Sequence, residues 1–456
     1  MNSGVPRDRT SIAILLPAAA VYLFAAWSLV ALSWDGSGYL FNSLQAGAPV
    51  ITHYRYSNFP MLFALVQARA FIDNPMWLGI GYGLLLSLTP LLSLVACLRI
   101  LRGPELAPLR IWPVLGILLG ALPGEICLMS EASLAVQAFW PLAAFALAGT
   151  PRRGIAWMAL FIPYLFFLHP TTAVMFGLAA ALCLELAISR SNVRRAAIMW
   201  AGIFGIAAAG RLIHSFFYAT NYERTELAWK PNWEAFLGAI WGWPIVLLAA
   251  IYLLAFACLA AGTGKFDSRT ARNWALAAGL AIIAIGCWWA SNAVLWNGAI
   301  SYRRFVLACA LPLVAMAGVH ARAIRRDTTP HHVPFFNRTC IFATWAFVIV
   351  YAVQAWTWRS DIARFSAALR TSPAPFVTTE DLPWIRNSPL EHWSATMLSI
   401  LVQGRQPRTI FSEHREGNAE GHIILFPGEG GLFPGHDGWF FIDPSHRAAA
   451  PLHSRE

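Results

Sequence analysis

The sequence predicts an all-α membrane protein with about eleven transmembrane helices and a small α+β extracytoplasmic domain at its C-terminus. Three observations carry this prediction. Hydrophobic residues make up 57% of the chain and charged residues only 12%, whereas soluble domains carry about 25% charged residues. Apolar runs near the length of about 20 residues that crosses a bilayer recur as far as Trp356. Arg and Lys gather in alternate connections between those runs.

The apolar runs define the candidate spans. In order they are Ser11 to Ser33, Met76 to Leu98, Ile111 to Pro123, Ala132 to Gly149, Ile155 to Leu168, Thr171 to Ile188, Ala196 to Phe217, Trp241 to Ala261, Asn273 to Ser291, Tyr302 to Ala321 and Thr339 to Trp356. The third and fifth runs are short for a span. The first run resembles a signal peptide, but it is longer than the usual apolar region of about 7–15 residues, so we interpret it as a retained anchor.

The basic residues set the orientation. One series of connections is rich in Arg and Lys: Arg7 and Arg9; Arg99, Arg102 and Arg110; Arg152 and Arg153; Arg190, Arg194 and Arg195; Lys265, Arg269 and Arg272; Arg322, Arg325, Arg326 and Arg338. By the positive-inside rule this series is cytoplasmic, so the N-terminus is inside and an odd number of spans puts the tail outside. We expect a multi-pass protein of the plasma (bacterial inner) membrane. Because the net charge of +10 follows from this topology, nucleic acid is not an expected partner.

Two regions are predicted, a transmembrane domain at residues 1–356 and an extracytoplasmic domain at residues 357–456. The outer loop at residues 34–73 is expected to hold two short amphipathic helices on the membrane surface. These cover Gly38 to Gln45 and Phe59 to Phe71. In the tail, the patterns indicate a helix at Ser394 to Leu401 and strands at His422 to Phe426 and Trp439 to Ile442.

The cysteines are expected to be small packing residues, because they lie in or beside apolar runs and form no CxxC pair. They are Cys97, Cys127, Cys183, Cys258, Cys287, Cys309 and Cys340.

Polar side chains at the predicted outer ends of the spans are the candidate functional groups, since polar groups at membrane depth are costly. Asp35 directly follows the first span. Its carboxylate could deprotonate an acceptor hydroxyl or hold a cation, or it could cap the following short helix. His53 and Arg55 lie in an aromatic, hydrogen-bonding stretch suited to a sugar or a phosphate. Interfacial anchoring is the alternative for this stretch.

Acidic and basic groups mark further outer turns. Glu125 and Glu131 could face Asp35 and hold a divalent ion or a sugar, or could cap the next helix. His169 is followed by two threonines that could cap the sixth span.

Three arginines lie near the outer ends of later spans. Arg211 must pair or extend to the interface. Arg303 and Arg304 open the tenth span, where two guanidinium groups beside a helix N-terminus suit a phosphate. Extension of these side chains to lipid headgroups is the alternative.

With these residues in view, the chain resembles the GT-C superfamily of membrane glycosyltransferases in architecture over about its first 356 residues. That resemblance implies an outer-face enzyme that uses sugars carried on polyprenyl phosphate. It implies that Asp35 is the catalytic base, that Tyr39 is the aromatic residue found a few positions later, and that Arg303 and Arg304 hold the lipid phosphate. Many members have paired acids in the first loop, whereas Gly36 follows Asp35 here, which favours a metal-independent reaction.

The sequence-based hypothesis is therefore an inverting glycosyltransferase of the cell envelope. It would move a sugar from a polyprenyl-phosphate donor to a glycolipid, polysaccharide or protein acceptor. His53, Arg55, Glu125 and His169 would shape the sugar pocket, with Glu131 as a further substrate contact. Arg211 could join Arg303 and Arg304 in binding the phosphate leaving group. No cofactor is expected; a divalent cation at Asp35 and Glu125 is the less favoured arrangement. The alternatives are a transporter or flippase of a lipid-linked saccharide, and a non-catalytic membrane protein of envelope assembly. Polar groups collect at one predicted face and no internal repeat is found, which favours the enzyme over the transporter.

Overall fold

The computed structural model describes residues 8–33, 35–51, 55–121, 131–218, 243–263, 302–326, 333–385, 388, 390, 394–411 and 439–441. Two of the predicted elements lie outside these residues, the span at Asn273 to Ser291 and the strand at His422 to Phe426. The predicted site residues His53 and Glu125 lie outside them as well.

Long apolar helices dominate the described part of the chain. Five of them are long and apolar enough to cross a membrane: α1 (Arg9–Trp27), α4 (Pro75–Ile100), α8 (Thr172–Ser189), α9 (Arg194–Phe217) with the turn before it, and α15 (Val333–Thr371). The chain is therefore an all-α membrane-embedded protein, as its composition predicts. The number of spans stays a prediction.

Five further helices coincide with predicted spans. They are α5 (Ile111–Ile117), α6 (Glu131–Leu147), α7 (Ile155–Phe166), α12 (Trp243–Thr263) and α14 (Tyr302–Arg326). The short third run forms α5 between two 3₁₀ turns, at Ala107–Arg110 and Leu119–Ala121.

Tertiary contacts hold the short helix α5 in place. A Cβ atom on its Gly116 would lie 1.9 Å from the Trp140 indole, so only glycine permits this approach to α6. Its Trp112 donates from Nε1 to His320 Nδ1 of α14 at 3.0 Å, and both side chains are buried. Gln137 of α6 also donates from Nε2 to Ile117 O at 3.2 Å. Packing and buried hydrogen bonds to neighbouring helices therefore fix this helix of only two turns.

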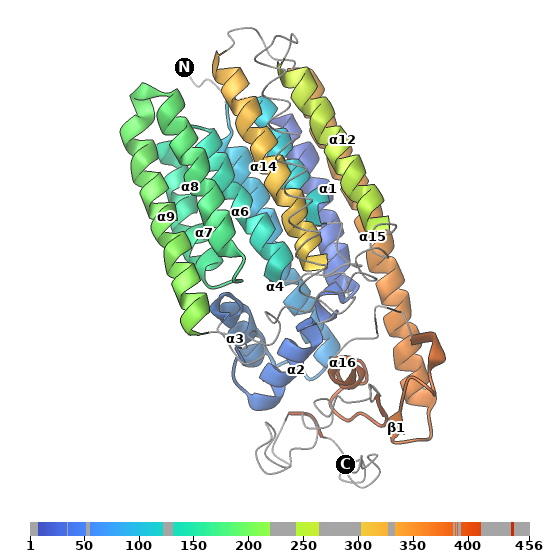
Figure 1. Ribbon diagram of the computed structural model, residues 1–456. Coiled ribbons are helices and arrows are strands. Elements are labelled where there is room, and N and C mark those ends of the chain that lie inside the picture. The colour runs from blue at the N-terminus through green and yellow to red at the C-terminus, as the bar shows by residue number, and fades with distance from the viewer. Residues whose placement is uncertain are drawn as a thin grey trace, which may run out of the picture. The chain divides into compact units, whose positions relative to one another are not determined.

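Residue contacts divide the chain into two compact units. Unit 1 contains residues 1–20, 88–125 and 131–350, and unit 2 contains residues 21–87, 126–130 and 351–456. Within unit 1, α6, α7, α8 and α9 pack against one another (Figure 1). Helix α14 packs against α5, α6 and α12.

Unit 2 contains the predicted helices of the 34–73 segment, as α2 (Asp35–Ala46) and α3 (Phe59–Ala68). Helix α3 exposes Phe59 and Phe63, as a surface helix would. Helix α2 differs from the expectation of a helix lying on the membrane surface. Most of its residues are buried against protein, because η1 (Val30–Leu32), α3 and the tail helix α16 (Ala395–Leu401) pack on it.

The tail is only partly as predicted. The expected helix at Ser394 to Leu401 is confirmed as α16. The strands of the described residues are β1 (Phe376–Val377) and β2 (Ile410–Phe411), which pair in parallel. The strand predicted at Trp439 to Ile442 is not formed over its described residues 439–441. There the Phe440 N–H donates to the Gln45 side chain, so this stretch makes no ladder.

The predicted domain boundary between residues 356 and 357 lies within α15, which continues unbroken to Thr371. Hydropathy marks where an apolar run ends, and Arg359 and Asp361 end this one. Polar side chains do not stop a helix, so the helix and the apolar run end at different residues.

Candidate functional site

Asp35 is the first residue of α2, where its negative charge is favourable beside the helix N-terminus. The chain reaches this point through a tight turn, in which the Ser33 hydroxyl donates to Val30 O at 2.7 Å and the Gly36 N–H to Ser33 O at 3.1 Å. Asp35 is partly exposed, at the beginning of a helix in which eight of the twelve residues are buried. Its position therefore suits both predicted roles, the cap and the base.

Gly36 lies against the backbone of the turn that precedes α2. In the structure, a Cβ atom on Gly36 would lie 1.7 Å from Ala31 O. The close approach is thus made to the chain's own backbone, and it fixes where α2 begins.

Tyr39 lies one turn after Asp35, on the same face of α2. The Arg55 guanidinium donates from Nη1 to the Tyr39 hydroxyl at 3.4 Å. Both side chains are buried, with Tyr39 7% and Arg55 5% exposed. Arg55 is therefore held inside unit 2, which argues against the alternative of an interfacial anchor. Three predicted residues, Asp35, Tyr39 and Arg55, thus belong to one local arrangement.

A second arrangement of predicted residues lies in unit 1, around Arg211. This arginine is only 2% exposed and so is paired rather than extended to the interface. Its Nε donates to His169 O at 3.4 Å and its Nη1 to His214 Nδ1 at 2.7 Å. Because a guanidinium only donates, Nδ1 of His214 must accept, which makes His214 a neutral imidazole protonated at Nε2.

The turn at His169 is organised by its own side chain. Its Nδ1 lies 2.8 Å from Thr171 Oγ1, and its carbonyl accepts from Thr172 Oγ1 at 2.7 Å. The threonine cap predicted for α8 is not formed: Thr171 occupies the N-cap position without a capping hydrogen bond from its side chain. The two hydroxyls instead shape the turn that presents the His169 carbonyl to Arg211.

Glu131 is buried and opens α6. It lies close enough to Tyr164 to interact with that phenol electrostatically, and the Tyr164 hydroxyl pairs with Thr89 Oγ1 at 2.8 Å. Tyr164 and Thr89 are not evident from the sequence as candidate residues, because single Tyr and Thr residues are common in apolar helices. The available signal was their occurrence inside two separate predicted spans.

Arg303 and Arg304 lie in the first turn of α14, which begins at Tyr302 as predicted. Their side chains are outside the described part of the chain. The cation proposed as the less favoured arrangement would need Glu125, which is also outside it. The described residues hold no group of three or more His, Cys, Asp or Glu side chains that could bind a metal ion. Four of the cysteines, Cys97, Cys183, Cys258 and Cys340, are free and buried.

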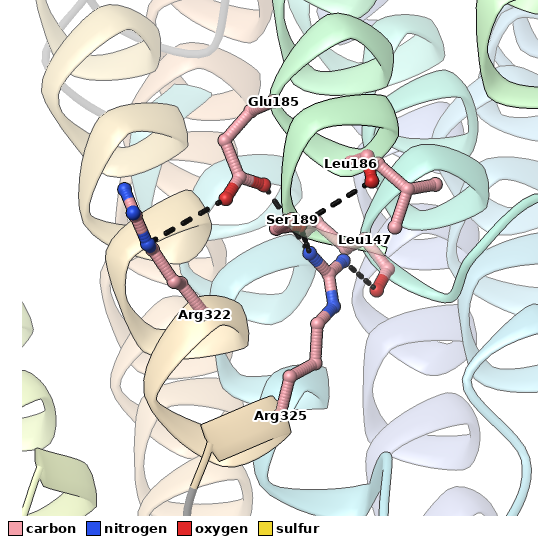
Figure 2. A network of polar contacts seen from close by, with 6 residues as sticks. All are labelled: Leu147, Glu185, Leu186, Ser189, Arg322 and Arg325. Carbon is pink, nitrogen blue, oxygen red and sulfur yellow. Dashed lines mark hydrogen bonds and ion pairs between the residues drawn. The ribbon is translucent and has the colours of Figure 1, made fainter. Parts of the chain in front are cut away.

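A polar network that the sequence analysis missed joins three helices of unit 1 (Figure 2). Glu185 lies inside the apolar run of α8, where a carboxylate is expected to be functional or paired. It is paired: Arg325 Nη1 lies 3.2 Å and Arg322 Nε 4.0 Å from its two oxygens. Arg325 also donates from Nη2 to Leu147 O at the end of α6, at 2.9 Å. We therefore interpret this network as a structural link between α6, α8 and α14.

Comparison with protein-family models, with curated proteins and with solved structures finds no match for this chain. Composition and fold define the class, an all-α membrane-embedded protein with two polar arrangements. One is centred on Asp35, Tyr39 and Arg55, and the other on Arg211, His169 and His214.

Proposed function

We propose that the protein is a multi-pass membrane glycosyltransferase of the GT-C type, acting at the outer face of the plasma membrane. About eleven spans, a cytoplasmic N-terminus and an extracytoplasmic tail belong to the same proposal. It would transfer a sugar from a polyprenyl-phosphate donor to a glycan, lipid or protein acceptor.

A single observation carries the proposal. Asp35 opens α2, one turn before Tyr39, whose phenol accepts a hydrogen bond from buried Arg55. A partly exposed carboxylate can take a proton, while the phenol and the guanidinium beside it can bind sugar hydroxyls or a phosphate. The acid and the phenol of α2, with the Arg55 guanidinium that contacts the phenol, supply the groups that glycosyl transfer needs.

In the proposed reaction the Asp35 carboxylate removes the proton from the acceptor hydroxyl. The acceptor oxygen then forms a bond to the anomeric carbon as the bond from that carbon to the phosphate oxygen breaks. Polyprenyl phosphate leaves with the bonding electrons, and the anomeric configuration inverts. Basic side chains, Arg303 and Arg304 foremost, would bind the leaving phosphate, as the resemblance implies.

Lipid and glycan mass spectrometry of cells tests this function. The strains carry wild-type protein, a deletion, Asp35→Asn or, as a matched control, Glu105→Gln at an exposed acid, all at equal expression. Because a general base contributes about 10²–10⁴-fold, Asp35→Asn should reproduce the deletion, with one glycan lacking a sugar and a polyprenyl-linked sugar accumulating. The control should match wild type.

A different result would redirect the assignment. If Asp35→Asn equals wild type while the deletion has a phenotype, Asp35 is a helix cap and the enzyme proposal fails. Accumulation of a complete lipid-linked saccharide, with no missing transfer step, would point instead to transport.

A further inference from the structure

Helix α2 presents two different faces within unit 2. Asp35 and Tyr39 are four residues apart and share one face with the Arg55 contact. Ser37, Phe41 and Gln45 repeat at the same spacing of four, which places them on a second face. Two residues rotate an α-helix by about 200°, so Ser37 lies almost opposite Asp35 and Phe41 almost opposite Tyr39, with Gln45 at the edge of the second face.

All three residues of the second face contact the tail. Ser37 Oγ and Ser394 Oγ share a hydrogen bond of 2.7 Å, and both side chains are fully buried. The rings of Phe41 and Phe440 stack with centroids 4.9 Å apart. Gln45 Oε1 accepts from the Phe440 N–H at 2.9 Å. The tail therefore holds α2 at its beginning, its middle and its end.

Arg405 ties these tail contacts to the end of the 34–73 segment. Its Nε donates to Trp439 O at 3.0 Å, and its guanidinium lies 5.2 Å and 5.3 Å from the Trp439 and Phe441 ring centroids. The same guanidinium pairs with Asp73 at 3.0 Å. Residues 439–441 thus contact α2 directly and are linked through Arg405 to Asp73, the last residue of that segment.

We propose that the tail is a positioning element for the candidate catalytic helix, with Ser394 as its principal positioning residue. This inference rests on the proposed function. By holding Ser37, Phe41 and Gln45 from behind, residues 394–411 and 439–441 set the rotation of α2 and so the direction in which Asp35 and Tyr39 face. The tail contacts the side of α2 that carries Ser37 and Phe41. In this proposal the tail residues that make these contacts do not bind the substrate.

Matched serine variants of the full-length membrane protein test the proposal. Ser394→Ala removes the hydroxyl that contacts Ser37. Ser399→Ala removes an equally buried hydroxyl of α16 that bonds only within the tail in the contacts described, to Thr396 O at 2.6 Å and Phe411 N at 3.1 Å. A displaced catalytic group can lower a rate by up to about 100-fold. Ser394→Ala should lower formation of the missing glycan product tenfold or more at equal protein level, and Ser399→Ala should not.

A cross-link provides the rescue. The pair Ser37→Cys and Ser394→Cys places two thiols where the hydroxyl oxygens lie 2.7 Å apart, a separation that a disulfide can close with little movement. Product formation by the double variant should rise on oxidation and fall on reduction, while both single-cysteine variants stay insensitive. A purely structural role would not make activity follow the redox state of a folded protein.

Hydrogen exchange of the α2 amides, residues 35–46, separates this proposal from the proposed function. Faster exchange in Ser394→Ala than in Ser399→Ala supports positioning by the tail, even if Asp35→Asn leaves the glycan unchanged. If Asp35→Asn abolishes transfer but Ser394→Ala, the cross-link and α2 exchange all match wild type, the enzyme stands and the positioning role is overturned.

Discussion

Glu185 of α8 and Arg325 of α14 form an ion pair at 3.2 Å, and Arg325 reaches on to the carbonyl of Leu147 at the end of α6. Three helices of unit 1 are thereby joined through one guanidinium (Figure 2). The contact explains why a carboxylate is tolerated in an otherwise apolar helix, because the charge is paired where it is poorly solvated.

Replacing Glu185 by Leu should therefore destabilise the protein. Arg325 is 10% exposed in its side chain and would lose its anionic partner, at a cost of about 1–3 kcal/mol. Arg322 is 41% exposed and lies 4.0 Å from the acid, so Arg322→Gln should cost less than about 1 kcal/mol. Unfolding of both variants in the same detergent checks the order, and equal losses would contradict it.

The hydrogen bond between Arg55 and Tyr39 predicts an effect on activity. Tyr39→Phe keeps the ring and removes the hydroxyl that Arg55 contacts, so transfer should fall by about tenfold, the value of one such hydrogen bond. Tyr56→Phe, at a side chain 47% exposed, is the control and should retain full activity. Product formation, measured relative to the amount of folded protein, tests this difference. Equal activity of the two variants would show that Tyr39 is not part of the site.

His214 is predicted to serve Arg211 as a neutral hydrogen-bond acceptor. Gln can supply an acceptor oxygen at this position, whereas Leu cannot. His214→Leu should therefore be less stable than His214→Gln by about 1 kcal/mol, because Arg211 is almost fully buried. Thermal unfolding of the two variants at equal protein concentration measures the difference. A more stable Leu variant would refute this role.

Gly36 should not tolerate any side chain. The Cβ atom of Gly36→Ala would lie 1.7 Å from Ala31 O, so the cost should reach or exceed the top of the range of about 1–3 kcal/mol for overpacking. Gly177→Ala in α8 meets nothing within 4 Å and should be neutral or slightly stabilising. The yield of folded protein on size-exclusion chromatography compares the two, and normal folding of Gly36→Ala would disprove the close approach.

Asp8 predicts a small dependence of stability on acid pH. Burial acts to raise the pKa of this carboxyl, but hydrogen bonds from Ser11 and the charge of Arg110, 2.6 Å away, outweigh it and hold the pKa below 3.8. A lowered pKa stabilises the fold above the unfolded value, and that stabilisation is lost as pH falls through the folded value. Asp8 is 37% exposed, so the effect is at most about 1 kcal/mol.

Asp8→Asn should therefore be less stable than wild type at pH 7, and the difference should shrink as pH falls below about 3.8. Unfolding measured at both pH values checks this. A difference that stays constant at low pH would exclude the ionised carboxylate as its cause.

Much of the fold follows from the sequence by local rules. A stretch that must cross lipid is apolar over about 20 residues. The runs that form α1, α4, α8, α9 and α15 are therefore recognisable in the sequence. The short helices α2, α3 and α16 are also evident from local pattern. The local pattern predicts the ends of helices less well than their positions. Helix α15 continues past its apolar run to Thr371, and α5 is shorter than the third apolar run.

Candidate residues were found by the same reasoning, since a polar group beside an apolar run is conspicuous. Asp35, Arg55 and Arg211 were identified in this way. Glu185 and Tyr164 were not, because each is a single polar residue within a long apolar run. What each residue contacts was beyond the sequence. Arg211 could pair or extend to the interface, and the positions of the His169 carbonyl and of the His214 ring decide that it pairs.

The sequence by itself determined that this chain is a membrane-embedded protein made of helices. The reason is that apolar runs and helix formation depend on residues only a few positions apart in the sequence. The tertiary structure alone decided that Ser37 meets Ser394, and that the tail packs on the helix that carries Asp35. Such contacts join residues hundreds of positions apart. They depend on side-chain shape and on complementary hydrogen-bonding groups in the folded chain, which no local pattern encodes.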